Sequence, residues 1–236
     1  GALAGAAACG LVNQAEAGKR HPQRGGTLRF ATRGDAAGLD PHRNTIYLVS
    51  TPLAATTQGL LDLDLQSEPV PGIAETWDIS PDLLTYTFKL RKGVLFHNGR
   101  EVDAEAVKWN FERIQDPKIG GPFTRSALGN LKETQAIDKY TLQCVLQEPS
   151  IAFLADVVYY PCNLIAPDSA EQANIHPIGC GPFKFVKWER NSITELVRFE
   201  NYYETDAEGN NLPYLDGIIG RPKKEDQVRL TALRAG

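Results

Sequence analysis

A strand that leads through tight turns into a capped amphipathic helix constrains the fold of this chain more than any other feature. Apolar and polar residues alternate over residues 85–90, and this two-residue period is typical of a half-buried strand. Asn98-Gly99 supplies a turn, and Asp103 is a good N-cap for residues 103–113, whose apolar side chains recur at helical spacing. Such a chain must combine strands with helices.

The same two periodicities recur along the rest of the chain. They predict strands at 27–30, 183–188 and 193–199 and on both sides of Asp138-Lys139, and helices at 50–61, 150–157 and 226–235. Residues 62–71 are mostly polar and contain two prolines, so we interpret them as a crossing between subdomains. The expected fold class is α/β.

The charge of the chain argues against a nucleic-acid partner. Its 25 basic and 29 acidic residues give a net charge of −4, and no basic block stands out that would follow a phosphate backbone. The same balance argues against a polybasic attachment to anionic lipid. Any link to a membrane is expected to come from another feature.

The first nine residues resemble the end of an export signal. Gly1–Cys9 is small and apolar and is too short to span a bilayer. Cys9 is a candidate for a lipidated first residue, and cleavage after an Ala-x-Ala sequence is the alternative. Both routes imply a periplasmic or extracellular protein, and residues 13–24 have the polar composition of a tether.

The other cysteines suggest one disulfide bond and one free thiol. Cys162 and Cys180 are expected to pair in an oxidising compartment and to close a loop of about 18 residues, a constraint that stabilises a fold by roughly 3 kcal/mol. Cys144 alternates with leucines in a predicted strand, which indicates a buried free thiol. There is no Cys-x-x-Cys sequence of the kind that binds zinc.

No pattern of catalytic or metal-binding residues stands out. The four histidines, His21, His42, His97 and His176, are isolated from one another and from cysteines. A Gly-x-Ser-x-Gly sequence of the hydrolase type is absent from the chain. We therefore expect no enzyme activity, no metal and no cofactor, with a secreted hydrolase as a distant alternative.

Several motifs, in a fixed order, resemble one family of binding proteins. They are Leu39-Asp40-Pro41-His42, Ile73-Ala74-Glu75-Thr76-Trp77, residues 85–94, Phe96-His97-Asn98-Gly99, Ala104-Glu105-Ala106-Val107, Gly179-Cys180-Gly181-Pro182-Phe183, Asn201-Tyr202-Tyr203 and Pro213-Tyr214-Leu215-Asp216. The chain resembles family 5 of the bacterial extracellular solute-binding proteins, which include the dipeptide, oligopeptide and nickel-binding proteins of ABC importers. Cys180 departs from the pattern, since the family commonly has Thr there.

The resemblance implies a two-lobe hinged fold of the periplasmic binding protein type, class II. It also implies that this chain is the amino-terminal part and is truncated before the second major lobe. The expected organisation is a signal remnant and tether at 1–24, the first part of the first lobe at 25–61, an inserted smaller subdomain at 62–149 and the second part of the first lobe at 150–236.

The function implied by the resemblance is the capture of a small solute outside the membrane and its delivery to an ABC permease. A peptide is the expected ligand, and a sugar, an opine or a nickel chelate is the alternative. The residues that match cleft-lining positions of the family are Thr45, Ile46, Tyr47 and Phe123. The protein is expected to act as a monomer.

Overall fold

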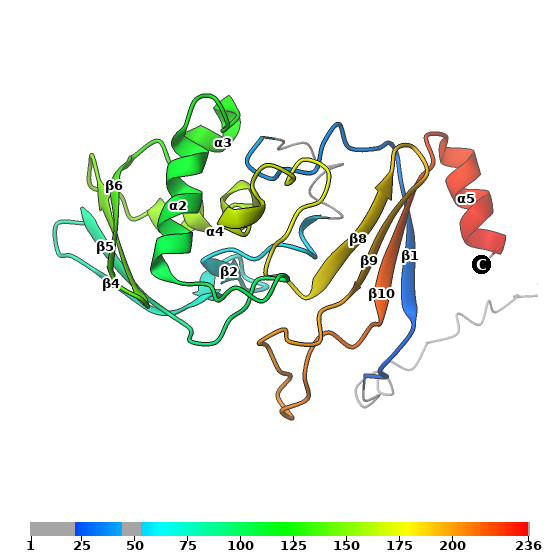
Figure 1. Ribbon diagram of the computed structural model, residues 1–236, viewed down its shortest axis with the longest axis horizontal. Coiled ribbons are helices and arrows are strands. Elements are labelled where there is room, and N and C mark those ends of the chain that lie inside the picture. The colour runs from blue at the N-terminus through cyan, green and yellow to red at the C-terminus, as the bar shows by residue number, and fades with distance from the viewer. Residues whose placement is uncertain (1–21, 44–52, 236) are drawn as a thin grey trace, which may run out of the picture.

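The structure is a computed structural model that describes residues 22–43 and 53–235, and its strands form two four-stranded sheets at opposite ends of the long axis (Figure 1). The first sheet contains, in spatial order, β1 (Thr27–Thr32), β10 (Gly217–Pro222), β9 (Ile193–Arg198) and β8 (Phe183–Glu189). The second contains β4 (Ala74–Ile79), β5 (Thr85–Leu90), β7 (Thr141–Leu146) and β6 (Leu131–Asp138). The first sheet is therefore built from both ends of the described chain, and the second from its middle.

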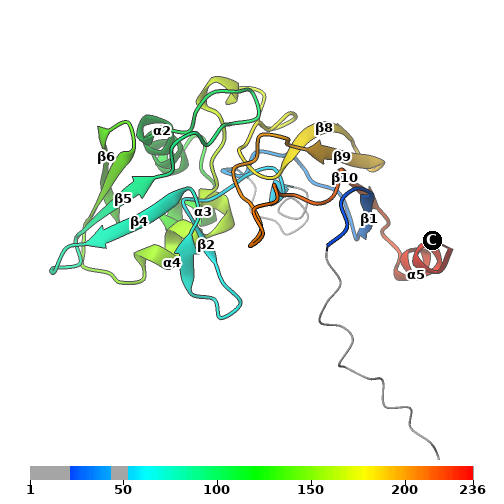
Figure 2. The ribbon, with the colours of Figure 1, turned by 90° about the horizontal axis from the view of Figure 1, so that it is seen from below.

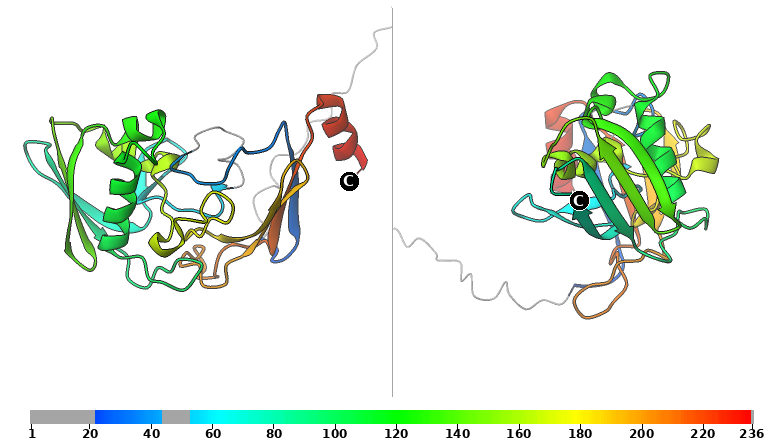
Figure 3. Two further views of the ribbon diagram at one scale, coloured as in Figure 1. Left: turned by 45° about the horizontal axis from the view of Figure 1, so that its top comes forward. Right: turned by 90° about the vertical axis from the view of Figure 1, so that its left-hand side faces the viewer.

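The second sheet buries one face against helix α2 (Ala104–Gln115). Tyr86, Phe88 and Leu90 lie on this face and are almost completely buried, whereas Lys89 is exposed. Asp103 caps the helix, because its carboxylate accepts the N–H of Ala106 at 2.8 Å. The strand and the capped helix predicted from the sequence are confirmed, and Figure 3 shows the helix beside the sheet.

Helical elements and loops connect the two sheets. They comprise α3 (Pro122–Ala127), α4 (Phe153–Val158) and the short 3₁₀ turns η2 (Tyr160–Cys162) and η3 (Pro167–Ser169), while α5 (Asp226–Ala235) lies beyond the first sheet. Figure 2 shows α5 at the end of the molecule opposite the second sheet. Within residues 22–43 and 53–235, no helix combines the length and the apolar character needed to cross a bilayer.

A buried asparagine fastens α2 to the loop after η2. Asn110 is fully buried, and its amide nitrogen donates to the carbonyl oxygens of Ala106 at 2.8 Å and Ile165 at 3.0 Å. Its amide oxygen accepts the N–H of Ile165 at 2.9 Å. One side chain thus satisfies both backbone groups of Ile165, a residue that is itself fully buried.

We expect Asn110→Ala to lower the free energy of unfolding by about 2 kcal/mol. The substitution leaves the buried N–H and C=O of Ile165 without partners, and each unsatisfied group costs about 1 to 3 kcal/mol before the structure relaxes. Urea denaturation of the variant beside wild type measures the difference. Gln135→Ala, on an outer strand, is the control, and equal midpoints for the two variants would contradict the prediction.

The helix predicted at 50–61 is wrong from residue 54 onward. Leu53 is helical, and its carbonyl accepts the hydroxyls of Thr56 and Thr57 at 3.0 and 2.9 Å as well as their backbone N–H groups, in a turn where the helix has already ended. The chain then becomes extended into β2 (Leu61–Leu63), which pairs with β3 (Pro69–Pro71) as a small antiparallel ribbon. The segment interpreted as a simple crossing is therefore a hairpin.

Strand β10 was not predicted, although it holds the first sheet together. It runs parallel to β1 on one side and antiparallel to β9 on the other. A Cβ at Gly220 would lie 2.9 Å from the ring of Phe30, and one at Gly217 would lie 2.7 Å from the Leu196 carbonyl oxygen. Close packing by the neighbouring strands explains why glycines interrupt the apolar pattern that marks a strand.

Candidate functional site

An exposed pair of aromatic rings is formed by α3 and by the segment that follows α4. Phe123 is 60% exposed and Tyr159 is 39% exposed, and their ring centroids are 5.9 Å apart in an edge-to-face arrangement. Phe123 lies in the first turn of α3, and Tyr159 lies between α4 and η2. Two large apolar surfaces that remain open to solvent at one place are typical of a binding surface.

Beside this aromatic pair, Asp40 and His42 in the loop before residue 44 form a buried polar cluster with Arg113. Arg113 donates to both carboxylate oxygens of Asp40, at 3.0 and 2.5 Å, and to Nδ1 of His42 at 2.7 Å. Asp40 is 1% exposed and His42 fully buried. Arg113 comes from α2, so this cluster joins the loop after β1 to the helix of the second sheet.

The contacts of His42 fix its protonation. Its Nδ1 receives a hydrogen bond from Arg113, and its Nε2 lies 3.0 Å from the carbonyl oxygen of Asn163, which can only accept. The ring is therefore neutral, with its proton on Nε2. Burial, followed by the nearby positive charge of Arg113, lowers the pKa of His42 to about 4. Burial has the largest single effect on the pKa of Asp40 and would raise it. The hydrogen bonds and positive charge of Arg113, together with His42, outweigh burial and hold that pKa below its usual value.

The motif around Cys180 is explained by close backbone packing. A Cβ at Gly179 would lie 2.0 Å from the Thr56 carbonyl oxygen, and one at Gly181 would lie 2.8 Å from the Thr56 carbonyl carbon. His97 binds this segment from the other side, because its N–H donates to the Gly179 carbonyl at 2.8 Å and its Nε2 lies 2.9 Å from the Gly181 carbonyl oxygen. The motif is a structural junction and not a reactive site.

The disulfide predicted between Cys162 and Cys180 is not formed in the structure, where both are buried free thiols, as is Cys144. The backbone of Gln58 bonds to Cys180 and to Leu164, two residues after Cys162. Its N–H is directed to the Cys180 sulfur, and its carbonyl accepts the N–H of Leu164 at 2.9 Å. Burial raises the pKa of all three thiols to about 12, which argues against a nucleophilic cysteine.

The residues predicted to bind ligand are only partly placed. Phe123 lies on the exposed surface described above, while Thr45, Ile46 and Tyr47 fall outside the described residues, as does Cys9. Tyr159 was missed. The sequence shows two adjacent tyrosines after a short apolar helix but does not show which of them faces solvent.

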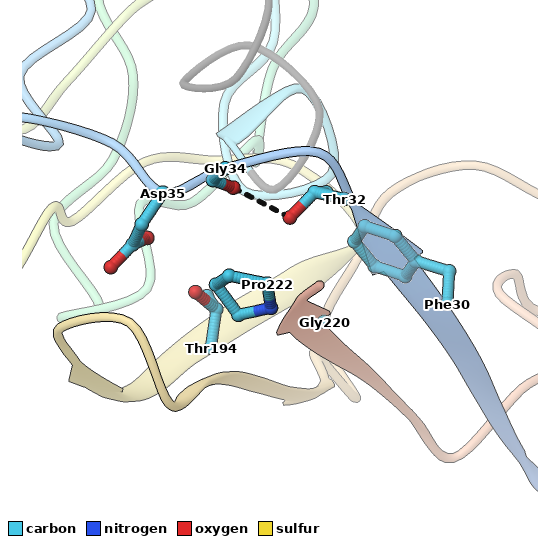
Figure 4. A pocket seen from close by; sticks show the side chains of 7 residues that line it. All are labelled: Phe30, Thr32, Gly34, Asp35, Thr194, Gly220 and Pro222. Carbon is cyan, nitrogen blue, oxygen red and sulfur yellow. Dashed lines mark hydrogen bonds between the residues drawn. The ribbon is translucent and has the colours of Figure 1, made fainter. Parts of the chain in front are cut away.

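The cavities of the described chain do not coincide with this surface. One, shown in Figure 4, lies between Phe30, Asp35 and Thr194, and its volume of about 10 Å³ is enough for little more than a water molecule. The other is an open surface hollow of about 420 Å³ along α5. Among residues 22–43 and 53–235 there is also no cluster of three or more His, Cys, Asp or Glu residues that could hold a metal ion.

Comparison with known proteins identifies the class. The model for family 5 of the bacterial extracellular solute-binding proteins, described as its middle part, matches residues 68–236. The chain belongs to this family, which is a family of binding proteins and not of enzymes. This agrees with the α/β fold and with the motifs noted in the sequence.

Individual relatives bind different solutes. The glutathione-binding protein of Pectobacterium atrosepticum is 32% identical over 203 residues, which are 84% of this chain and 38% of that protein. A periplasmic binding protein of Helicobacter pylori in complex with the peptide STSA superposes with a TM-score of 0.81 at 29% identity, over 91% of this chain and 46% of that one.

A third relative, from Agrobacterium tumefaciens R10, was solved in complex with agropinic acid. It superposes with a TM-score of 0.82 at 29% identity, over 89% of this chain and 42% of that one. This chain thus spans less than half the length of each of these relatives.

Proposed function

We propose that this chain forms one side of a solute-binding cleft in an exported protein that delivers its ligand to an ABC permease. The ligand is a peptide or a similarly extended small solute, held between two lobes that hinge together. The protein acts as a monomer in the periplasm or outside the cell. Anchoring through a lipid on Cys9 and the lobe boundaries near residues 61 and 149 belong to the same proposal.

The observation that carries the proposal is the exposed aromatic pair, Phe123 and Tyr159. Both rings keep a large part of their surface open even though the chain has two buried cores around them. Arg43 adds a half-exposed guanidinium whose Nε lies 3.3 Å from the Asp40 carboxylate, and its backbone carbonyl oxygen would lie 3.2 Å from a Cβ at Gly121, the N-cap of α3. Rings for apolar groups and a cation for a carboxylate suit a short peptide.

The relatives support a peptide without excluding other solutes. Glutathione is itself a tripeptide, and the Helicobacter pylori relative holds a tetrapeptide, whereas agropinic acid is not a peptide. A sugar, an opine or a nickel chelate would leave the transport role unchanged. The distant hydrolase alternative has little support, because His42 and His97 are buried and both bind backbone carbonyls.

We expect Phe123→Ala and Tyr159→Ala each to weaken solute binding by about tenfold. Loss of a buried aromatic contact at a binding surface costs about 1 to 2 kcal/mol, and 1.4 kcal/mol corresponds to a factor of ten in affinity. Calorimetric titration of the full-length protein with Ser-Thr-Ser-Ala and with glutathione measures the change.

The control for these variants is Ile137→Ala. Ile137 is 54% exposed on β6, in the sheet that carries no part of the proposed surface. The control should bind both peptides as wild type does. If Phe123→Ala and Tyr159→Ala bind as well as the control, the aromatic pair does not contact the solute and the proposal fails at this point.

A further inference from the structure

The two rings of the aromatic pair come from separate elements, so their arrangement depends on contacts elsewhere. Phe123 belongs to α3, which begins after Gly121, and Tyr159 directly precedes η2, which ends at Asn163. A ring pair at 5.9 Å is useful for binding only if these two elements keep a fixed distance and angle.

His42 hydrogen bonds to both elements. Its backbone carbonyl accepts the N–H of Gly121 at 3.1 Å, at the start of α3. Its ring Nε2–H donates to the carbonyl of Asn163 at 3.0 Å, at the end of η2. The Asn163 amide in turn donates to the hydroxyl of Thr57 at 3.1 Å, which extends the connection into the first lobe. One residue therefore joins the supports of both rings.

Asp40 and Arg113 hold His42 in place. Arg113 donates to His42 Nδ1 at 2.7 Å, and the Asp40 carboxylate accepts the backbone N–H of His42 at 3.0 Å. Arg113 is 8% exposed and also packs over the ring of Trp109, with its guanidinium carbon 5.7 Å from the ring centroid. A buried imidazole whose two ring nitrogens are both hydrogen bonded has one rotamer and one tautomer available.

The neighbouring elements supply little of this connection themselves. The hydroxyl oxygens of Thr124 in α3 and Tyr160 in η2 are both buried without a hydrogen-bond partner. Neither of these hydroxyls therefore helps to join α3 to η2. The hydrogen bonds described above connect the two elements through His42. Loss of the His42 ring would remove the bonds to Asn163 and Arg113, and only the backbone bond to Gly121 at the start of α3 would remain.

We propose that Asp40, His42 and Arg113 act as positioning residues that set the geometry of Phe123 and Tyr159 and so tune solute affinity without touching the solute. The inference deepens the proposed function and rests on it. It assigns a role in binding to the buried ion pair of Asp40 and Arg113. Stability alone does not explain such a pair, because buried ion pairs are often no more stabilising than apolar side chains of the same size.

The test compares His42→Leu with His42→Gln in the full-length protein. Leu keeps the volume but makes neither ring hydrogen bond, whereas the Gln amide N–H reaches the Asn163 carbonyl and its oxygen accepts from Arg113. The readouts are the affinity for Ser-Thr-Ser-Ala and glutathione and the ¹⁹F resonance of 3-fluorotyrosine at position 159, assigned with Tyr159→Phe. The ring of Phe123 shifts that resonance only while the two rings stay together.

We expect His42→Leu to move the Tyr159 resonance and to weaken binding at least tenfold, and His42→Gln to restore both toward wild type. If the role of His42 is purely structural, His42→Leu lowers the melting temperature. At temperatures well below that melting point, however, the Tyr159 resonance and the solute affinity stay as in wild type, and this result would overturn the inference. If His42→Leu does not fold, Asp40→Asn, which weakens the grip on Arg113 and leaves His42 in place, is judged by the same readouts.

The same experiment separates the inference from the proposed function. If Phe123→Ala binds both peptides like wild type, the proposed binding surface is wrong, whatever the His42 variants do. If Phe123→Ala binds weakly but His42→Leu retains affinity and the wild-type resonance, the surface stands and the positioning role is refuted. An unchanged resonance refutes it even when neither peptide binds.

Discussion

Replacing Arg113 by Met should lower the free energy of unfolding by about 3 to 5 kcal/mol, the largest single effect that we expect. The substitution removes both hydrogen bonds to the Asp40 carboxylate, which is 1% exposed, and the hydrogen bond to His42. Loss of Arg113 leaves the buried carboxylate with only the half-exposed guanidinium of Arg43, whose Nε lies 3.3 Å away, and loss of the buried partner of an ion pair is costly for that reason. Chemical denaturation at neutral pH measures the loss.

Two comparisons isolate the buried charge as the cause. Lys108→Met removes an ion pair with Glu112 on the exposed side of the same helix, and we expect a change of less than about 1 kcal/mol. Asp40→Asn added to Arg113→Met should recover part of the loss, because it removes the buried charge that has lost Arg113 as a partner. Equal losses for Arg113→Met and Lys108→Met would rule out the cluster as a main source of stability.

Acidification should destabilise the protein steeply between pH 6.5 and pH 4. Burial is the main cause that lowers the pKa of His42 and of His97 from 6.5 to about 4. In this range the unfolded chain binds protons that the folded chain excludes, so stability rises with pH and is lost as the pH falls. Each histidine contributes about 3 kcal/mol at 1.36 kcal/mol for each pH unit of difference.

The carboxylate of Asp62 has the opposite effect on stability as the pH falls. Burial and the neighbouring charge of Glu204 raise the pKa of Asp62 to about 6, so its protonation favours the folded state as the pH falls. Because Asp62 is only partly buried, solvent screens this contribution and it offsets the histidines incompletely. We expect a net loss on the order of 4 kcal/mol between pH 6.5 and pH 4.

Urea denaturation at several pH values checks this prediction. His42→Gln and His97→Gln should each reduce the slope of unfolding free energy against pH, because Gln does not titrate. The account of the buried histidines is refuted if wild type is equally stable at pH 6.5 and pH 4.5, or if neither substitution changes the slope.

The elements whose signals are local could be predicted from the sequence. β5 has a strict two-residue alternation, and α2 has a capping aspartate and a helical apolar stripe, so neither needs a distant partner to be recognised. β10 could not be recognised in this way. Its glycines are required by Phe30 of β1 and by Leu196 of β9, and only the folded sheet shows why they are there.

The residues of the candidate site likewise differ in how far the sequence alone could identify them. Phe123 was found through the family resemblance, whereas Tyr159 required knowledge of which of two adjacent tyrosines faces solvent. The cluster of Asp40, His42 and Arg113 was out of reach, because Arg113 lies more than 70 positions from the other two and meets them only when α2 packs on the loop. The helix predicted at 50–61 failed from residue 54 onward, where the chain turns and then pairs as β2.

The central claim is that the full-length protein binds a small solute and leaves it unchanged, and thermal unfolding in the presence of candidate solutes tests it most directly. A ligand present at one hundred times its dissociation constant adds about 2.7 kcal/mol to stability, which is easily seen as a raised melting temperature. We predict that di-, tri- or longer peptides raise the melting temperature and are recovered intact by mass spectrometry. Cleavage of the peptide, or no stabilisation by any peptide, sugar, opine or nickel chelate, would contradict the account.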